Sequence, residues 1–195
     1  GRATEQREKL QNAGGQDAVF RSLSIAPWHV LKNRARNHTR ALIIDGDIGY
    51  TGGVAFNDSW LVNAQSEHEY RDTMFRVTGA MSRNLQSAFN QGWTAMTGEI
   101  LQGYPYFFTG SASNESQNTY VSLASTPTPD TLTLQKLVQL SVLSAQERVY
   151  VTTPYFLTDA PLRALLIRKA KSGVDVRVLV PGEKTDAKTV RYASH

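Results

Sequence analysis

The last third of the chain alternates between strand-like and helix-like segments, and this order limits its fold more than any other feature. Apolar and polar residues alternate over residues 148–153 and again over 174–180. Between them a helical pattern runs over residues 159–172 and stops at Gly173. A strand, a crossover helix and a second strand make a βαβ unit, whose strands run parallel. The sequence therefore predicts an α/β protein.

The first half of the chain predicts antiparallel strands. Residues 41–44 and 48–51 form strand patterns on either side of the turn signal at residues 45–47, and a further strand is predicted at 74–77. An amphipathic helix is predicted from Met81 to Met96, with Gly98 beyond its end. The remaining predicted elements are helices at residues 4–12 and 131–146 and strands at 18–23 and 120–123. We expect a mixed β-sheet flanked by helices, while two related sheets are the alternative.

Composition bounds the function classes. The chain has 195 residues, of which 41% are hydrophobic, enough for a buried core. Without cysteine it can form no disulfide, no thiolate zinc site and no cysteine nucleophile. Its net charge of +4 favours anionic partners such as phosphates, nucleic acid or anionic lipid. No apolar run approaches the roughly 18 residues that span a bilayer, so membrane contact is expected to be peripheral or to belong to a segment outside this sequence.

A change of composition separates two parts of the chain. Residues 98–130 are rich in Gly, Ser, Asn, Thr and Pro, which favour loops, and contain an aromatic cluster at residues 104–108. We therefore predict a first domain over residues 1–98, a linker over 99–117 and a second domain over 118–195. The aromatic cluster can pack against a sheet or dip into a membrane interface.

The segment with the clearest chemical potential is residues 37–46, which lead into and along a predicted strand. Side chains alternate along a strand, so His38 and Arg40 point to one face and Asp45 to the other. An imidazole can act as nucleophile or proton shuttle while a guanidinium holds two phosphate oxygens. On spacing alone, however, a His beside an Arg is more often a surface pair.

These residues resemble a known family. The pattern His38-x-Arg40-x4-Asp45, followed by the pair Gly52-Gly53, is similar to the motif of the phospholipase D superfamily, in which most members carry Lys at the position of Arg40. The order and spacing of several other segments are similar to the cardiolipin synthase branch: residues 52–60, 70–79, 89–93, 97–99, 151–156, 173–182 and 186–194. The resemblance covers about residues 10–195 and implies a phospholipase D-like fold.

The resemblance implies a phosphatidyltransferase that works through a phosphohistidine, with no cofactor and no metal. One of two catalytic histidines attacks the phosphodiester, the other protonates the leaving alcohol, and a second alcohol or water resolves the intermediate. His38 would be one of the two, and Arg40 would bind the nonbridging oxygens. Asp72 would orient the catalytic histidine through its other nitrogen, while Asp45 would fix the turn and strand.

Gly52 and Gly53 are expected to let the backbone approach the substrate phosphate, although a glycine pair also fits a simple hairpin turn. The chain departs from the family at two positions. Ala55 stands where many relatives have an Asn that helps to hold phosphate. Arg40 keeps the positive charge of the usual Lys but is bulkier and adds a bidentate fork.

The family needs two His motifs, and the sequence contains one. His195 is not the second, because no Lys follows it. We expect residues 1–98 to be the C-terminal part of one phospholipase D-like domain and 118–195 the N-terminal part of the next, as an excerpt of a longer enzyme. A homodimer that brings two copies of His38 together is the alternative way to complete the site.

The expected partners are a phospholipid similar to phosphatidylglycerol and an alcohol acceptor, at a cell membrane. A phosphodiesterase or nuclease of the same superfamily and a non-catalytic phosphate-binding module are the alternatives, and Glu99 in its Thr-Gly-Glu context favours the lipid branch. The remaining aromatic and histidine residues are expected to have structural and not catalytic roles. Trp60, Phe89 and Trp93 are predicted to lie in the core, and His68, like His29, in an exposed loop.

Overall fold

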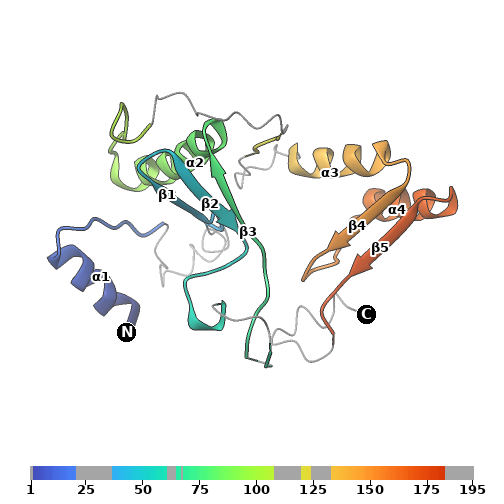
Figure 1. The fold of residues 1–195 in the computed structure, drawn as a ribbon, viewed down its shortest axis with the longest axis horizontal. Coiled ribbons are helices and arrows are strands. Elements are labelled where there is room, and N and C mark those ends of the chain that lie inside the picture. Colours follow the sequence, from blue (N-terminus) through green and yellow to red (C-terminus); the bar gives the residue numbers. More distant parts are fainter. Residues whose placement is uncertain are drawn as a thin grey trace, which may run out of the picture. The chain divides into compact units, whose positions relative to one another are not determined.

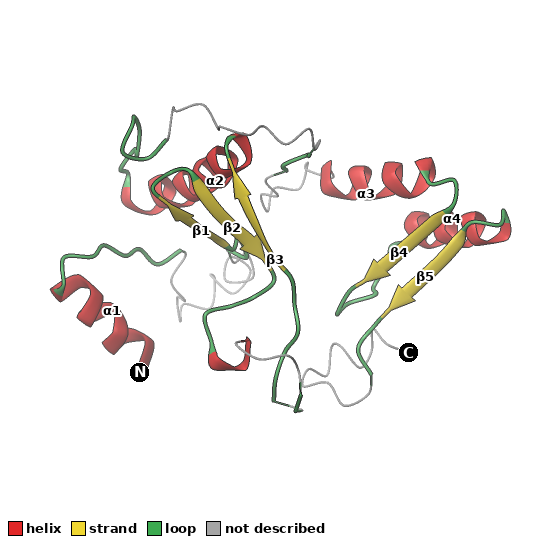
Figure 2. Ribbon diagram, viewed as in Figure 1, coloured by secondary structure: helices red, strands yellow, loops and turns green. Residues whose placement is uncertain are grey.

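The computed structural model describes residues 2–20, 37–60, 65–66, 68–107, 120–123 and 133–182. The chain divides into two compact units, the first made of residues 1–63 and 70–122 and the second of 64–69 and 123–195. Among the described residues, one antiparallel sheet of three strands and one parallel sheet of two strands are accompanied by helices (Figure 1, Figure 2). The α/β class is confirmed, with the two kinds of strand pairing distributed over two sheets.

The first unit contains the antiparallel sheet. Its strands are β1 (Ala41–Ile44), β2 (Ile48–Gly52) and β3 (Met74–Thr78), with β2 in the middle. Ile43 pairs with Gly49, which pairs with Val77 on its other side. The predicted hairpin and third strand are confirmed.

A tight turn joins β1 to β2. The Asp47 N–H donates to the Ile44 carbonyl over 3.2 Å, and the two central residues both have positive φ, 52° at Asp45 and 68° at Gly46. Positive φ at both positions is typical of the type I′ turns that match the twist of a hairpin, and Asp and Gly tolerate it best. The Asp-Gly sequence therefore sets the register of the first two strands.

Helix α2 (Ala80–Thr97) covers one face of this sheet. Leu85 is buried, and a Cβ on Gly49 would lie only 2.8 Å from its side chain, so the helix approaches the central strand closely. The Ser82 hydroxyl donates to the Gly46 carbonyl over 3.5 Å and connects the helix to the hairpin turn. The helix ends as predicted, at Gly98 with φ 77°.

The residues that follow α2 fold back onto it. The side-chain amide of Asn90 donates to the carbonyl of buried Leu101 over 2.7 Å, and the Thr94 hydroxyl donates to the Glu99 carbonyl over 2.6 Å. The Trp93 indole N–H donates to the Glu99 carboxylate over 2.7 Å. Glu99 thus has a structural role, because it holds the segment after α2 against the helix. The predicted boundaries of the two domains and the linker stay predictions.

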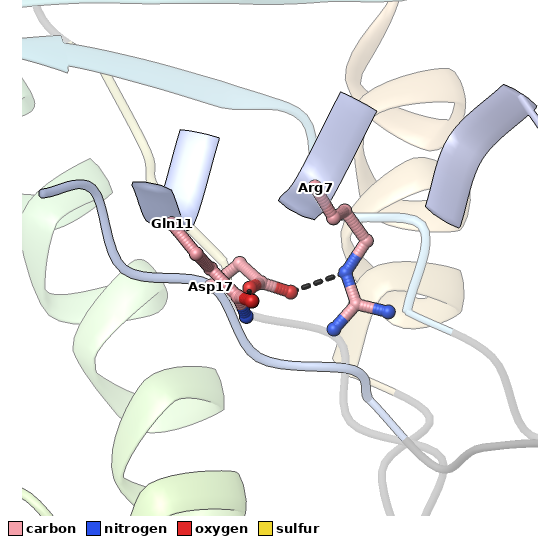
Figure 3. A network of polar contacts seen from close by, with 3 residues as sticks. All are labelled: Arg7, Gln11 and Asp17. Carbon is pink, nitrogen blue, oxygen red and sulfur yellow. Dashed lines mark hydrogen bonds and ion pairs between the residues drawn. The ribbon is translucent and has the colours of Figure 1, made fainter. Parts of the chain in front are cut away.

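The chain begins with helix α1 (Arg2–Asn12), as predicted. Asp17 accepts hydrogen bonds from Arg7 and Gln11 and so connects the helix to the segment after it (Figure 3). The strand predicted at residues 18–23 is wrong in its described part, because residues 18–20 are irregular; the rest lies outside the described residues. Ala18 and Phe20 both line a cavity between α2 and the start of β1, so their alternation accompanies a shared cavity and no strand pairing.

The second unit contains the parallel pair β4 (Arg148–Thr152) and β5 (Asp175–Leu179), joined by helix α4 (Ala160–Lys171) and preceded by helix α3 (Thr133–Ser144). Arg148 pairs with Asp175 at the start of the parallel register. The predicted helix and βαβ unit are confirmed.

Local signals explain where the elements of the second unit begin and end. Asp159 caps α4 by accepting from the Leu162 N–H over 2.7 Å, and Gly173 follows the helix with φ 93°. The core of this unit includes the buried side chains of Val142, Leu166 and Val174.

The strand predicted at 120–123 is wrong. This segment is irregular and pairs with none of the described strands, and an isolated four-residue run has no ladder to stabilise it.

Candidate active site at one end of the antiparallel sheet

The residues of the His motif enter β1 alongside the end of β2. Thr51 pairs with Ala41, and its hydroxyl donates to the Arg40 carbonyl over 2.9 Å. This bond continues the contact of the two strands beyond the last regular pair. Arg40 therefore lies opposite Gly52, at the end of the sheet away from the hairpin turn.

His38 and Arg40 are expected to face away from α2. Asn37, Thr39 and Ala41 line a cavity of about 130 Å³ together with α2 residues that include Phe89 and Trp93. Since side chains alternate along an extended chain, residues 38 and 40 are expected to point to the opposite face of the sheet. Both are exposed. That the pair shares one face stays a prediction.

Arg40 rests on an aromatic pair from another part of the first unit. Its guanidinium carbon lies 5.6 Å from the ring centroid of Trp60, at the end of the short 3-10 helix η3 (Asp58–Trp60). Trp60 in turn packs on Tyr70, with centroids 4.9 Å apart and ring planes at 31°. The prediction that Trp60 lies in the core is wrong, since its half-buried ring supports a charged side chain.

Asp72 lies at the same end of the sheet. Asp72 lies two residues before Met74, which pairs with Gly52 at the end of β2. Its carboxylate accepts from the Thr73 N–H over 2.7 Å. Two strand spacings, about 10 Å, separate its backbone from the His motif.

Gly52 and Gly53 allow the chain before β3 to approach the end of β2. A Cβ on Gly52, whose φ is 154°, would lie 2.1 Å from the Thr73 carbonyl oxygen. A Cβ on Gly53 would lie 1.8 Å from the Asp72 carboxylate. The glycine pair thus has a steric reason that the sequence did not reveal, while its approach to a substrate phosphate stays a prediction.

Asp45 is not near the other candidates. It lies in the turn at the far end of β1, about 20 Å from His38 for seven residues of extended chain. Its positive φ and its position in the hairpin are consistent with the predicted role in fixing the turn.

The structure also locates the other candidates. His68 is exposed, as predicted, and His29 lies outside the described residues. Phe89 stacks on Trp93 with centroids 5.8 Å apart, but the prediction that it is a core residue is wrong, because 42% of it is exposed. Within the described ranges no three His, Asp or Glu side chains gather to hold a metal ion, and no helix is long and apolar enough to cross a membrane.

Three polar candidates, His38, Arg40 and Asp72, thus lie at the same end of the antiparallel sheet, away from its hairpin turn. An imidazole, a guanidinium and a carboxylate can supply a nucleophile, an anion ligand and a hydrogen-bond acceptor. The sequence analysis missed two residues. It gave no role to Tyr70, and it did not predict the contact of Trp60 with Arg40. No local pattern signals them, because Trp60 lies 20 residues and Tyr70 30 residues after Arg40 in the chain.

Comparison with known proteins gives a consistent assignment. Residues 141–195 match the family model described as "Cardiolipin synthase, PLD-like domain". A cardiolipin synthase of Geobacillus thermodenitrificans (strain NG80-2) is 32% identical over 187 residues, which cover 96% of this chain and 37% of the relative. Cardiolipin synthase 2 of Bacillus anthracis is 33% identical over 187 residues, covering 96% of this chain and 36% of the relative.

The similarity extends over both units. A cardiolipin synthase of Halalkalibacterium halodurans is 32% identical over 193 residues, covering 95% of this chain and 38% of the relative. The chain spans little more than a third of the length of these curated relatives. No solved structure gives a significant match. Because the aligned region includes His38, Arg40 and Asp72 as well as the βαβ unit, the chain belongs to the phospholipase D superfamily, in its cardiolipin synthase-like branch.

Proposed function

We propose that this chain supplies one half of the active site of a phosphatidyltransferase similar to cardiolipin synthase. One observation carries the proposal: His38, Arg40 and Asp72 lie at the same end of the β1–β3 sheet, away from its hairpin turn. The names of the relatives support the choice of a phospholipid as the substrate. The donor is then a lipid similar to phosphatidylglycerol, and the acceptor is an alcohol.

The reaction proceeds in two displacements at phosphorus. An imidazole nitrogen of His38 attacks, the P–O bond to the leaving alcohol breaks, and a second histidine donates a proton to the departing oxygen. The acceptor alcohol then loses its proton to that second histidine and attacks the phosphohistidine. The P–N bond breaks, and His38 is restored.

Two further side chains assist these steps. Arg40 binds the nonbridging phosphate oxygens through its in-plane N–H groups, because a guanidinium matches two oxygens at once. Asp72 orients a catalytic imidazole by accepting a hydrogen bond from the nitrogen that does not react. The glycine pair at residues 52–53 lets the backbone approach the phosphate, because it carries no Cβ.

The second histidine comes from another part of the protein or from a second copy of the chain. A second copy completes the site if its His38 meets the first across a two-fold axis. Membrane association is part of the proposal, and peripheral contact is favoured by Ile100 and Tyr104, each 69% exposed just after α2. Aromatic rings are favoured at membrane interfaces.

The test is to trap the covalent intermediate. This chain and a longer form that carries a second His motif are incubated with a short-chain phosphatidylglycerol, and acid-labile phosphatidyl-histidine is located by mass spectrometry. In the longer form we expect an adduct on His38 and a loss of turnover of at least about a thousandfold in His38→Ala. His68→Ala is the matched control, since His68 is also an exposed histidine of a described loop.

Each alternative predicts another outcome. Turnover that persists in His38→Ala would contradict the role of His38 as nucleophile. Cleavage of a DNA phosphodiester by the longer form, without lipid turnover, would indicate a nuclease. Phosphate binding that depends on Arg40, without adduct or turnover, would indicate a non-catalytic phosphate-binding module.

A further inference from the structure

The most informative feature outside the proposed reaction steps is the stack of Arg40 on Trp60 and of Trp60 on Tyr70. We infer that Trp60 and Tyr70 form an aromatic support that positions the Arg40 guanidinium for a substrate phosphate. The inference rests on the proposed function of Arg40 as the phosphate ligand. It makes Trp60 and Tyr70 positioning residues, which act through Arg40 without touching the reacting atoms.

The stack leaves the hydrogen-bonding edge of the arginine available. A guanidinium contacts a ring through its flat face, whereas its N–H groups point outward in its own plane. The guanidinium carbon lies 5.6 Å from the Trp60 centroid, within the range of a cation–π contact. Within the described parts of the chain no carboxylate pairs with Arg40, so its donors remain available for an anion.

Backbone hydrogen bonds hold the aromatic support in place. The Tyr70 N–H donates to the Ser59 carbonyl over 2.8 Å. This bond connects the backbone of Tyr70 to that of the residue before Trp60. The Trp60 N–H donates to the Asn57 carbonyl over 2.9 Å, and the Asn57 side chain accepts from the Ser59 N–H over 3.0 Å. These bonds fix the backbone that carries both rings, and the ring contact itself orients the indole.

A fixed support changes what the arginine contributes. A free arginine side chain loses rotamer entropy when it binds a phosphate. A guanidinium already stacked on a held ring has lost part of this freedom, so less is lost on binding. A lysine ammonium is a compact point charge with no flat face. It therefore cannot lie flat on the Trp60 ring while presenting a planar fork of N–H donors to the phosphate.

The structure thus explains why arginine can occupy a position at which the family usually has lysine. The guanidinium is bulkier, and the ring of Trp60 provides a surface for the extra atoms. It follows that Arg40 and Trp60 act as a pair, and that replacing one removes most of the benefit of the other.

A double-mutant cycle tests this pair. Inorganic phosphate and a short-chain phosphatidylglycerol are titrated separately into the 195-residue chain and into Trp60→Leu, Arg40→Lys and the double variant. Nuclear magnetic resonance follows the Arg40 Nε–Hε signal, or the nearest backbone amides where residue 40 is Lys. We expect Trp60→Leu to weaken phosphate binding by about three- to tenfold with Arg40 present and by less than about twofold with Lys. A larger effect on the lipid than on inorganic phosphate would indicate that the headgroup is the ligand.

Two further variants guard against a purely structural effect. Trp60→Phe keeps a ring under the guanidinium and should retain most of the affinity. Trp93→Phe replaces another half-buried tryptophan of the same unit, on the α2 side of the sheet, and should leave phosphate binding unchanged. The stack itself is read from the upfield ring-current shift of the Arg40 signal, which should disappear in Trp60→Leu and persist in Trp60→Phe.

The outcomes separate this inference from the proposed function. If phosphate binding is lost in Arg40→Ala but unchanged in Trp60→Leu, the positioning role is wrong and the phosphate site stands. An Arg40 signal with no ring-current shift would also overturn the positioning role. If the shift is present but no phosphate or lipid perturbs Arg40, the phosphate site itself is wrong, and the inference fails with it.

Discussion

Each unit of the molecule places an arginine over an aromatic ring, but the two arginines keep different hydrogen-bonding capacities. In the second unit Arg177 lies 5.4 Å from the Tyr150 centroid and donates to both carboxylate oxygens of Asp175 over 2.9 Å. In the first unit Arg40 lies at a similar distance from Trp60, without such a carboxylate among the described residues. An arginine stacked on a ring is therefore not in itself a sign of a binding site. Among the described residues, Arg40 is distinguished by donors that no carboxylate occupies.

The two units also use glycine differently. Gly52 and Gly173 both have positive φ, at 154° and 93°. A Cβ on Gly52 would lie 2.1 Å from the Thr73 carbonyl oxygen, whereas a Cβ on Gly173 would meet nothing within 4 Å. Gly173 therefore serves the backbone angle that ends a helix, while Gly52 also serves the close approach of two chain segments beside the candidate site.

The largest expected effect comes from replacing these two glycines. Gly52→Ala adds a backbone clash to an unfavourable φ and should destabilise the first unit by about 3 kcal/mol or more. Gly173→Ala has only the unfavourable φ and should destabilise the second unit by about 1 kcal/mol. Hydrogen exchange of the amides in β3 and β5 measures the two losses within one protein. Equal losses would show that the approach of Thr73 to Gly52 is not a close one.

A second variant gives Arg40 the carboxylate that Arg177 already has. Asp175 precedes Arg177 by two residues on one strand face, and Leu42 follows Arg40 by two residues on one strand face. Leu42→Asp should weaken the binding of phosphate about tenfold, because the new carboxylate pairs with the guanidinium and repels the anion. Since 40% of Leu42 is exposed, the fold should tolerate the change.

The control for this experiment is Leu42→Asn, which has the same shape as the aspartate but no charge. It should bind phosphate nearly as well as the original chain in the same titration. If both variants weaken phosphate binding equally, loss of the leucine would explain the effect, and the comparison between Arg40 and Arg177 would fail.

The accuracy of the sequence predictions depended on how far apart the interacting residues are in the chain. The Asp-Gly turn, the glycines after α2 and α4 and the Asp159 cap act within a few residues, and the elements that they bound were predicted correctly. The placement of His38 and Arg40 on one face is a prediction from strand alternation alone. These features need no knowledge of tertiary structure.

Features that depend on distant contacts were missed. The alternation at residues 18–20 indicated a strand, but it accompanies a cavity lined by residues of α2, about 70 residues later in the chain. The sequence predicts Trp60 in the core. A tryptophan between polar loop residues gives no indication that it contacts an arginine 20 residues earlier in the chain. The steric role of Gly52 and Gly53 depends on Asp72 and Thr73, which lie about 20 residues away.

The smallest expected effect concerns pH. Hydrogen bonds from Arg177 and then from Tyr150 lower the pKa of the Asp175 carboxyl below its ordinary value. Because this pKa is lower in the folded than in the unfolded state, the carboxylate stabilises the second unit above its unfolded pKa of about 3.9. The stabilisation is lost as the pH falls through the folded pKa. Asp175→Asn should therefore slightly reduce the stability of the second unit at neutral pH and flatten its dependence on pH below about 4.

Unfolding of the two proteins between neutral pH and pH 2, followed at β5 amides, measures this contribution. The carboxylate also raises the pKa of the Tyr150 phenol through its hydrogen bond, so Asp175→Asn should lower that pKa. An unchanged phenol titration would show that Asp175 does not hold the pair in solution. If Arg177 binds no phosphate in Asp175→Asn either, its missing imidazole and glycine neighbours, and not its carboxylate, distinguish it from Arg40.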